Sequence, residues 1–190
     1  MQTEKKYMSN RKPMVLVLAG PNGSGKSTIT QFFDIVGTYT NADDMVSATG
    51  MSNEEAAIRA DEMRYHSIEK KEDFTFETVL SSRYKLDILE KAKSEGYFIK
   101  CIFVLTVDAS VNVARVAARV ALGGHNVDED KIRSRYEKSI GNIRRLMEIC
   151  DILHVYDNTE EPVRIIRKHK DQISIFPNDL WSEDRILSLL

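Results

Sequence analysis

The sequence predicts an α/β fold in which a mostly parallel sheet is covered by helices on both faces. Two observations support this prediction. Short apolar runs typical of fully buried strands alternate along the chain with helical segments, and a glycine-rich loop leads from the first strand directly into a helix. Strands separated by helices pair in parallel through right-handed crossovers, so their carboxyl ends share one edge of the sheet, where ligands of such folds bind.

Length and composition favour one domain with its own core, since the chain has 190 residues, 42% hydrophobic and 29% charged. We expect a polar, flexible tail over 1–12 and a single domain over 13–190. Cys101 and Cys150 lack metal-ligand or redox spacing, which indicates buried thiols in a reducing compartment. No stretch approaches the roughly 18 apolar residues that cross a membrane, so we expect a cytoplasmic protein without membrane contact.

The predicted elements follow one another with few interruptions. Ser52 and Glu55 form a capping pair for one helix, and Asn126 and Glu129 a second pair for the helix over 127–150. A basic turn joins the two strands of a C-terminal β-hairpin. In chain order the elements are strand 14–20, helix 27–36, strand 38–44, helix 52–71, strand 74–79, helix 82–94, strand 97–107, helices 109–122 and 127–150, strand 152–159, hairpin 163–176 and helix 182–190.

The loop after the first strand matches the pattern G-x-x-x-x-G-K-[ST]. Backbone N–H groups of such a loop close around phosphates, and the dipole of the following helix favours the anion. We expect Lys26 to reach the β- and γ-phosphates of ATP and Ser27 to bind Mg²⁺. The predicted nucleotide-binding residues are Gly20, Pro21, Asn22, Gly23, Ser24, Gly25, Lys26, Ser27 and Thr28.

Missing motifs narrow the class of P-loop protein. The chain has no Asn-Lys-x-Asp guanine-specificity motif and no transporter-ATPase signature, and it is too short for the extra domains of motors. The segment 34–37 fits D-x-x-G, but it lies too close to the P-loop to sense a γ-phosphate. A P-loop kinase fold and a small-molecule acceptor are therefore expected. The net charge of −2 argues against a nucleic-acid substrate.

Acidic residues lie at the ends of the second and third predicted strands. The strand 38–44 ends in Asp43 and Asp44, and Glu77 is near the end of 74–79. We predict that Asp43 accepts the proton of an acceptor hydroxyl and that Glu77 binds the acceptor. The alternatives are an N-cap role for Asp43 or Asp44 and a surface position for Glu77.

Arginines on two consecutive helices are candidates for binding phosphate. Arg115 and Arg119 are four residues apart and share one helical face. Arg133 and Arg135 flank the apolar stripe of the next helix on opposite sides, so periodicity does not choose between them. The segment Gly123-Gly124-His125 between the helices is a candidate lid hinge.

The motifs GPNGSGKST, NADD, FETVLSS, RVALGGHNVDEDKIRSRYEKSIGNI and LHVYDNT, in this order, resemble the zeta-toxin family of P-loop kinases. The resemblance covers about 13–160 and is closest to the short, single-domain branch. It implies a toxin that phosphorylates the amino-sugar 3′-hydroxyl of UDP-N-acetylglucosamine or a related UDP-sugar, and a cognate antitoxin protein as partner.

The resemblance also implies roles for individual residues. It implies that Lys26 is the Walker lysine, Asp43 the general base, Glu77 an acceptor-binding acid and Arg119 a phosphate clamp, with the second clamp on Arg133 or Arg135. Two alternatives remain open: a kinase for another acceptor, such as a nucleoside, sugar acid or antibiotic, and a nucleotide-dependent regulatory ATPase without an acceptor.

Overall fold

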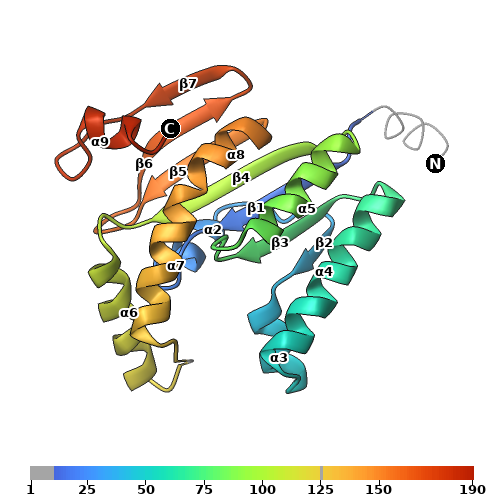
Figure 1. The fold of residues 1–190 in the computed structure, drawn as a ribbon, viewed down its shortest axis with the longest axis horizontal. Coiled ribbons are helices and arrows are strands. Elements are labelled where there is room, and N and C mark those ends of the chain that lie inside the picture. Colours follow the sequence, from blue (N-terminus) through green and yellow to red (C-terminus); the bar gives the residue numbers. More distant parts are fainter. Residues whose placement is uncertain (1–10, 125) are drawn as a thin grey trace.

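The computed structural model describes residues 11–124 and 126–190 and contains one seven-stranded sheet (Figure 1). The strand order is β2-β3-β1-β4-β5-β6-β7, in which the first five strands are parallel, whereas β6 pairs antiparallel with both β5 and β7. The predicted α/β fold with a mostly parallel sheet is confirmed. The strands are β1 (Met14–Ala19), β2 (Thr38–Thr40), β3 (Phe74–Thr78), β4 (Phe98–Leu105), β5 (Ile152–Asp157), β6 (Val163–His169) and β7 (Gln172–Ile175).

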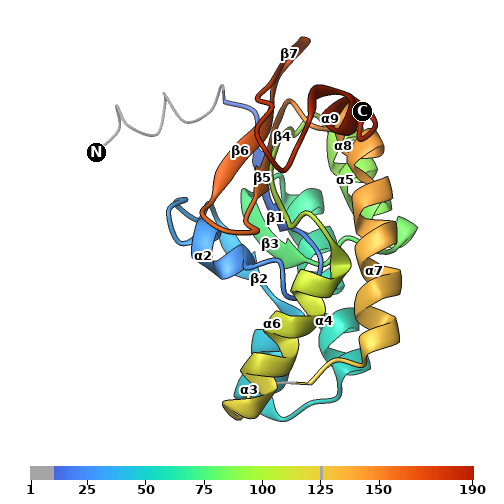
Figure 2. The ribbon, with the colours of Figure 1, turned by 90° about the vertical axis from the view of Figure 1, so that its left-hand side faces the viewer.

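Helices cover the two faces of the sheet unequally (Figure 2). The larger core lies on the face of α4, α5, α8 and α9, whereas α2 covers only part of the other face, over Leu16, Leu18, Ile102 and Val104. The helices are α2 (Lys26–Thr30), α3 (Ala42–Thr49), α4 (Asn53–Lys70), α5 (Arg83–Ser94), α6 (Ala109–Ala121), α7 (Glu129–Gly141), α8 (Ile143–Ile149) and α9 (Glu183–Leu187).

The helix after the P-loop is shorter than predicted, ending at Thr30 instead of Val36. Phe32 would lie within the longer predicted helix, but its side chain is 77% exposed, so it provides no packing that would support another turn. The next residues instead bind β3: the N–H of Val36 donates to Thr75 Oγ1 at 2.9 Å, and Thr75 Oγ1 donates to the C=O of Val36 at 2.8 Å. Hydrogen bonds to the neighbouring strand therefore replace those of a longer helix.

The predicted helix over 127–150 is two helices, α7 and α8, that meet at Asn142. The side-chain amide of Asn142 donates to the C=O of Leu80 at 2.8 Å, so this residue ties the junction to the loop after β3. The predicted N-terminal pair of Asn126 and Glu129 is also wrong. Asp128 caps α7 by accepting hydrogen bonds from the N–H groups of Asp130 and Lys131, as a short carboxylate just before a helix does.

The C-terminal hairpin and the last helix form as predicted, as β6, β7 and α9. Residues 1–10 of the predicted tail lie outside the described residues. Arg11, also placed in that tail, pairs with Asp73 at 2.5 Å. Among the described residues, no helix combines the length and apolar character needed to cross a bilayer.

Candidate active site

The P-loop has the backbone shape that phosphate binding requires. Gly20, Gly23 and Gly25 have positive φ angles of 145°, 78° and 78°. At Gly25, just before α2, an added Cβ would lie 2.1 Å from Nδ2 of Asn158. A side chain there would be strained and would clash, so glycine is required for this loop shape.

Two asparagines from outside the motif hold the loop in place. The side-chain amide of Asn158, after β5, donates to the C=O of Ser24 at 2.8 Å. The amide of Asn112, on α6, donates to the C=O of Asn22 at 2.6 Å, and its own Oδ1 accepts from Thr106. Sequence reasoning gave these residues no role. The run DNT at 157–159 carried the only signal, a polar group directly after a buried strand.

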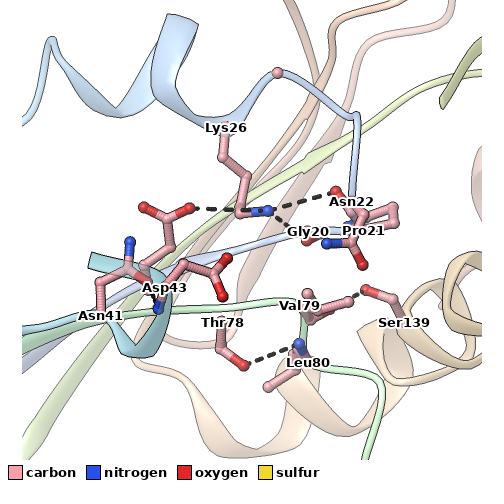
Figure 3. A network of polar contacts seen from close by, with 12 residues as sticks. Gly20, Pro21, Asn22, Lys26, Asn41, Asp43, Thr78, Val79, Leu80 and Ser139 are labelled. Carbon is pink, nitrogen blue, oxygen red and sulfur yellow. Dashed lines mark hydrogen bonds and ion pairs between the residues drawn. The ribbon is translucent and has the colours of Figure 1, made fainter. Parts of the chain in front are cut away.

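Lys26 lies at the centre of the site, held by backbone carbonyls (Figure 3). Its Nζ donates to the C=O of Gly20 at 2.9 Å and lies 3.9 Å from Oε1 of Glu77. Burial lowers the pKa of Lys26, and the charges of Glu77 and Asp43 oppose that shift. The loose ion pair leaves the ammonium able to exchange these contacts for a phosphate.

Glu77 is partly buried at the carboxyl end of β3, next to Tyr39 of β2. The Tyr39 hydroxyl donates to Oε2 of Glu77 at 3.3 Å. Burial raises the pKa of Glu77. Burial and the negative charge of Glu77 together raise the pKa of Tyr39 to about 12. Tyr39, which the sequence did not reveal, therefore orients the Glu77 carboxyl, whose Oε1 lies on the side of Lys26.

Asp43 and Asp44 lie in the first turn of α3, not at the end of a strand as predicted. The second strand ends at Thr40, and Asn41 caps α3 by accepting from the N–H of Asp43 at 3.0 Å. The N-cap alternative for the two aspartates is therefore also wrong. The Asp43 carboxylate is exposed and points into the space between Lys26 and the loop after β3 (Figure 3).

The structure distinguishes Arg133 from Arg135, which helical periodicity could not do. Arg135 points inward, and its Nη1 donates to Oδ1 of Asn22 in the P-loop at 3.2 Å. Arg133 is 48% exposed and pairs with Glu129 one turn earlier on α7, at 2.8 Å. Of the two, only Arg135 is bonded to the P-loop.

The arginines of α6 also differ. Arg115 is half-buried and donates to the C=O of Thr159 at 2.9 Å, which binds α6 to the segment after β5. Arg119 is exposed in the last turn of α6, and its charge contributes to lowering the pKa of Lys26. Gly124 packs on its stem, since a Cβ there would lie 2.6 Å from Cγ of Arg119. Of the predicted hinge, His125 lies outside the described residues.

The loop after β3 borders the site and is held by α7 and by Asn142 at the junction of α7 and α8. Ser139 donates to the C=O of Val79 at 2.7 Å, and the N–H of Leu80 donates to Thr78 Oγ1 at 3.0 Å (Figure 3). Leu80 is buried with a positive φ of 55°, an unfavourable conformation for leucine that these contacts maintain.

A buried cluster of charged residues binds the end of β2, next to the start of α3. Arg64 of α4 is 2% exposed, donates to Oγ1 and the C=O of Thr40 at 2.9 and 3.3 Å, and pairs with Asp61 at 2.7 Å. Asp61 also accepts from Tyr84 at 2.8 Å and from Lys85 at 2.7 Å. Thr40 directly precedes the Asn41 cap, so the cluster fixes the start of α3. The only signal in the sequence was Asp61 and Arg64 at helical spacing among buried alanines.

For a metal ion, the described part of the site offers the Ser27 hydroxyl but no cluster of carboxylate ligands. The described residues contain no group of three or more His, Cys, Asp or Glu side chains that could hold a metal. Ser27 is exposed in the first turn of α2. Mg²⁺ at nucleotide sites is held mainly by phosphates and water, with one or two protein oxygens, so this donor set fits it. The Ser24 hydroxyl is buried in the loop without a hydrogen-bond partner among the described residues, an unsatisfied polar atom beside the cradle.

The family profile described as "Zeta toxin" matches residues 38–179. The chain belongs to the zeta toxin family. The match begins at Thr38, so the P-loop assignment depends on the motif and geometry alone. A Haemophilus influenzae relative described as an uncharacterized protein is 29% identical over 123 residues, which cover 62% of this chain and 88% of that protein.

Solved structures share the fold of this zeta toxin family member at low identity. A chain from the AvrRxo1-ORF1:-ORF2 complex has a TM-score of 0.65 at 16% identity, with 94% of this chain covered. The chain spans 65% of the length of that structure. A chain from the PezAT toxin-antitoxin system of Streptococcus pneumoniae has a TM-score of 0.60 at 15% identity, covering 85% of this chain and 77% of that one.

Proposed function

We propose that this protein is an ATP-dependent kinase that transfers the γ-phosphate to a hydroxyl of a small acceptor, most specifically a UDP-sugar. The observation that carries the proposal is the arrangement around Lys26, where the P-loop, Glu77, Asp43 and Arg135 converge at one edge of the sheet. Family membership supports it. So does an AvrRxo1-ORF1:-ORF2 structure with ATP, which has a TM-score of 0.64, covering 90% of this chain.

The mechanism assigns each charge a role in moving the phosphoryl group. P-loop N–H groups and Lys26 bind the β- and γ-phosphates. Asp43, which is exposed and faces the same space, accepts the proton of the acceptor hydroxyl. The hydroxyl oxygen bonds to the γ-phosphorus while the bond from that phosphorus to the β–γ bridging oxygen breaks, so that ADP leaves. Arg135 and Arg119 stabilise the negative charge that develops on the transferred group. Glu77 accepts hydrogen bonds from the acceptor's hydroxyls.

Ser27 would hold Mg²⁺ together with the nucleotide phosphates. The ion would neutralise charge on the phosphate oxygens.

We further propose that the protein acts as a toxin with a protein antitoxin. The support is family membership and the similar structures, one from a toxin-antitoxin system and one from a two-protein complex. The wild-type protein expressed alone is then expected to arrest bacterial growth, and Lys26→Ala to be tolerated.

The decisive experiment incubates the purified protein with ATP, Mg²⁺ and a panel of UDP-sugars, nucleosides, sugar acids and antibiotics, with mass spectrometry of the products. We expect one added phosphate on a UDP-sugar amino-sugar 3′-hydroxyl, and none with Lys26→Ala. Phosphate on a different class would reject the UDP-sugar and keep the kinase. ATP hydrolysis with no phosphorylated acceptor would favour a regulatory ATPase.

A further inference from the structure

The sheet has a basic face on the side that α2 covers only in part, formed by Lys100, His154, Arg164, Arg167 and His169 (the basic face). The strand register places these side chains together. His154 lies opposite Arg167 and Tyr156 opposite Arg164, while Lys100 pairs with Ile152, which lies opposite His169. The alternate residues Leu153 and Val155 enter the main core on the other face.

No described helix covers this part of the sheet. The main contacts of α2 are with β1 and β4, and Figure 2 shows β6 and β7 extending beyond it, with α8 and α9 on the opposite side. Tyr156 of β5 and Phe33, three residues after the end of α2, border the basic face with ring centres 6.4 Å apart, edge to face. The face is therefore a partly apolar surface carrying several positive charges.

The cations of the basic face are not neutralised within the described part of the chain. Lys100, Arg164 and Arg167 form no ion pair and no side-chain hydrogen bond there, and Nε of Arg164 is buried without a partner. Burial and these neighbouring cations together lower the pKa of His154 to about 4. An anionic ligand would relieve this repulsion.

The rings argue for a protein ligand and against a nucleic acid. Base stacking requires an open aromatic face. Lys100 Nζ lies 5.3 Å from the ring centre of Phe33, and Arg164 Cζ lies 5.4 Å from that of Phe176, so cations already cover one face of each ring. Carboxylates match the forked donors of arginines and need no stacking.

We propose that the basic face binds an acidic segment of a partner protein in extended conformation. Arg164 and His169 are five residues apart on β6, about 17 Å along the strand, which an extended run of about five residues spans. This inference goes beyond the proposed kinase activity and does not depend on it, since it requires no phosphoryl transfer.

The test uses a capped decapeptide of alternating glutamate and alanine, with a glutamine-for-glutamate peptide as control and a single-stranded RNA decamer as competitor. Binding to isotope-labelled protein is followed by NMR at low salt. We expect the glutamate peptide to shift amides of β4, β5 and β6. We also expect its affinity to fall about five- to tenfold in the double variant Lys100→Gln/Arg167→Gln, since paired surface charges contribute modestly.

The matched control is Lys70→Gln/Lys138→Gln, which removes two exposed lysines from α4 and α7 and should leave the affinity unchanged. The proposal is overturned if the peptide does not shift these strands, if both double variants weaken binding equally, or if RNA binds the basic face more tightly than the peptide. ATP titrations of the same samples report on the P-loop separately, so failure of the kinase proposal would be distinguishable.

Discussion

Two charge clusters contact neighbouring residues at the end of β2, one through Tyr39 and the other through Thr40, and they differ in how completely their charges are paired. Around Arg64, the guanidinium and the Asp61 carboxylate have partners at 2.7–3.3 Å, and Arg64 is 2% exposed. Around Lys26, the ion pair to Glu77 is 3.9 Å long and the Ser24 hydroxyl has no partner among the described residues. Complete pairing is typical of a structural support, whereas incomplete pairing leaves groups that a ligand can satisfy.

The largest effect is expected in the cluster around Lys26, at Asp43, the proposed general base. Asp43→Asn should lower kcat by about 10²- to 10⁴-fold, because the amide cannot accept the hydroxyl proton, while ATP affinity stays near that of the wild type. Steady-state phosphorylation of the acceptor and ATP titration measure the two quantities. Asp44→Asn is the matched control on the same helical turn and should have far less effect. The reverse ranking would move the base by one residue.

The cluster around Arg64 should instead contribute to the free energy of unfolding. Arg64→Met should lower the free energy of unfolding by about 3–5 kcal/mol, because it removes one partner of a buried ion pair and leaves Thr40 without its donors. Arg59→Met, on the same helix, breaks the exposed pair with Glu62 and should cost at most about 1 kcal/mol. Urea unfolding measures both. Equal losses would show that the cluster around Arg64 does not support the fold more than a surface pair does.

Arg135 connects the cluster around Lys26 to α7. For catalysis, the planar, two-pronged geometry of its guanidinium should be more important than its positive charge. Arg135→Lys should reduce kcat by about 10²- to 10³-fold, the range for losing one donor to a developing negative charge. Arg133→Lys, two residues away and paired with Glu129, should stay close to wild type. Acceptor phosphorylation at saturating ATP distinguishes them. A larger loss at Arg133 would assign the second clamp to that residue.

The smallest expected effect concerns the basic face, which is also an incompletely paired cluster. The folded-state pKa of His154 is about 4, below the usual 6.5, so between these values the unfolded chain binds more protons. The free energy of unfolding should therefore decrease as pH falls from about 6.5 to 4. His154→Gln should flatten this slope, and His66→Gln, at an exposed position, should not. Urea unfolding across this pH range provides the test, and identical slopes would contradict the prediction.

The α/β class of the fold and the P-loop follow from the sequence alone. A short apolar run followed by a glycine-rich loop, as at 14–20, indicates a central strand, and the spacing of glycines and Lys26 is local, so both can be read from neighbouring residues. Helix ends supported by local caps were also predictable, as with Ser52 and Glu55, whose side chain and backbone bond each other reciprocally.

Tertiary structure decided the features that depend on contacts between distant segments. The helix after the P-loop stops at Thr30 because Val36 binds Thr75, and α7 ends because Asn142 binds Leu80. Likewise, Arg133 and Arg135 flank the same apolar stripe symmetrically, and only the position of the P-loop beside α7 turns Arg135 toward Asn22. Helical periodicity defines which face a residue occupies, but the identity of its neighbour depends on how distant elements pack.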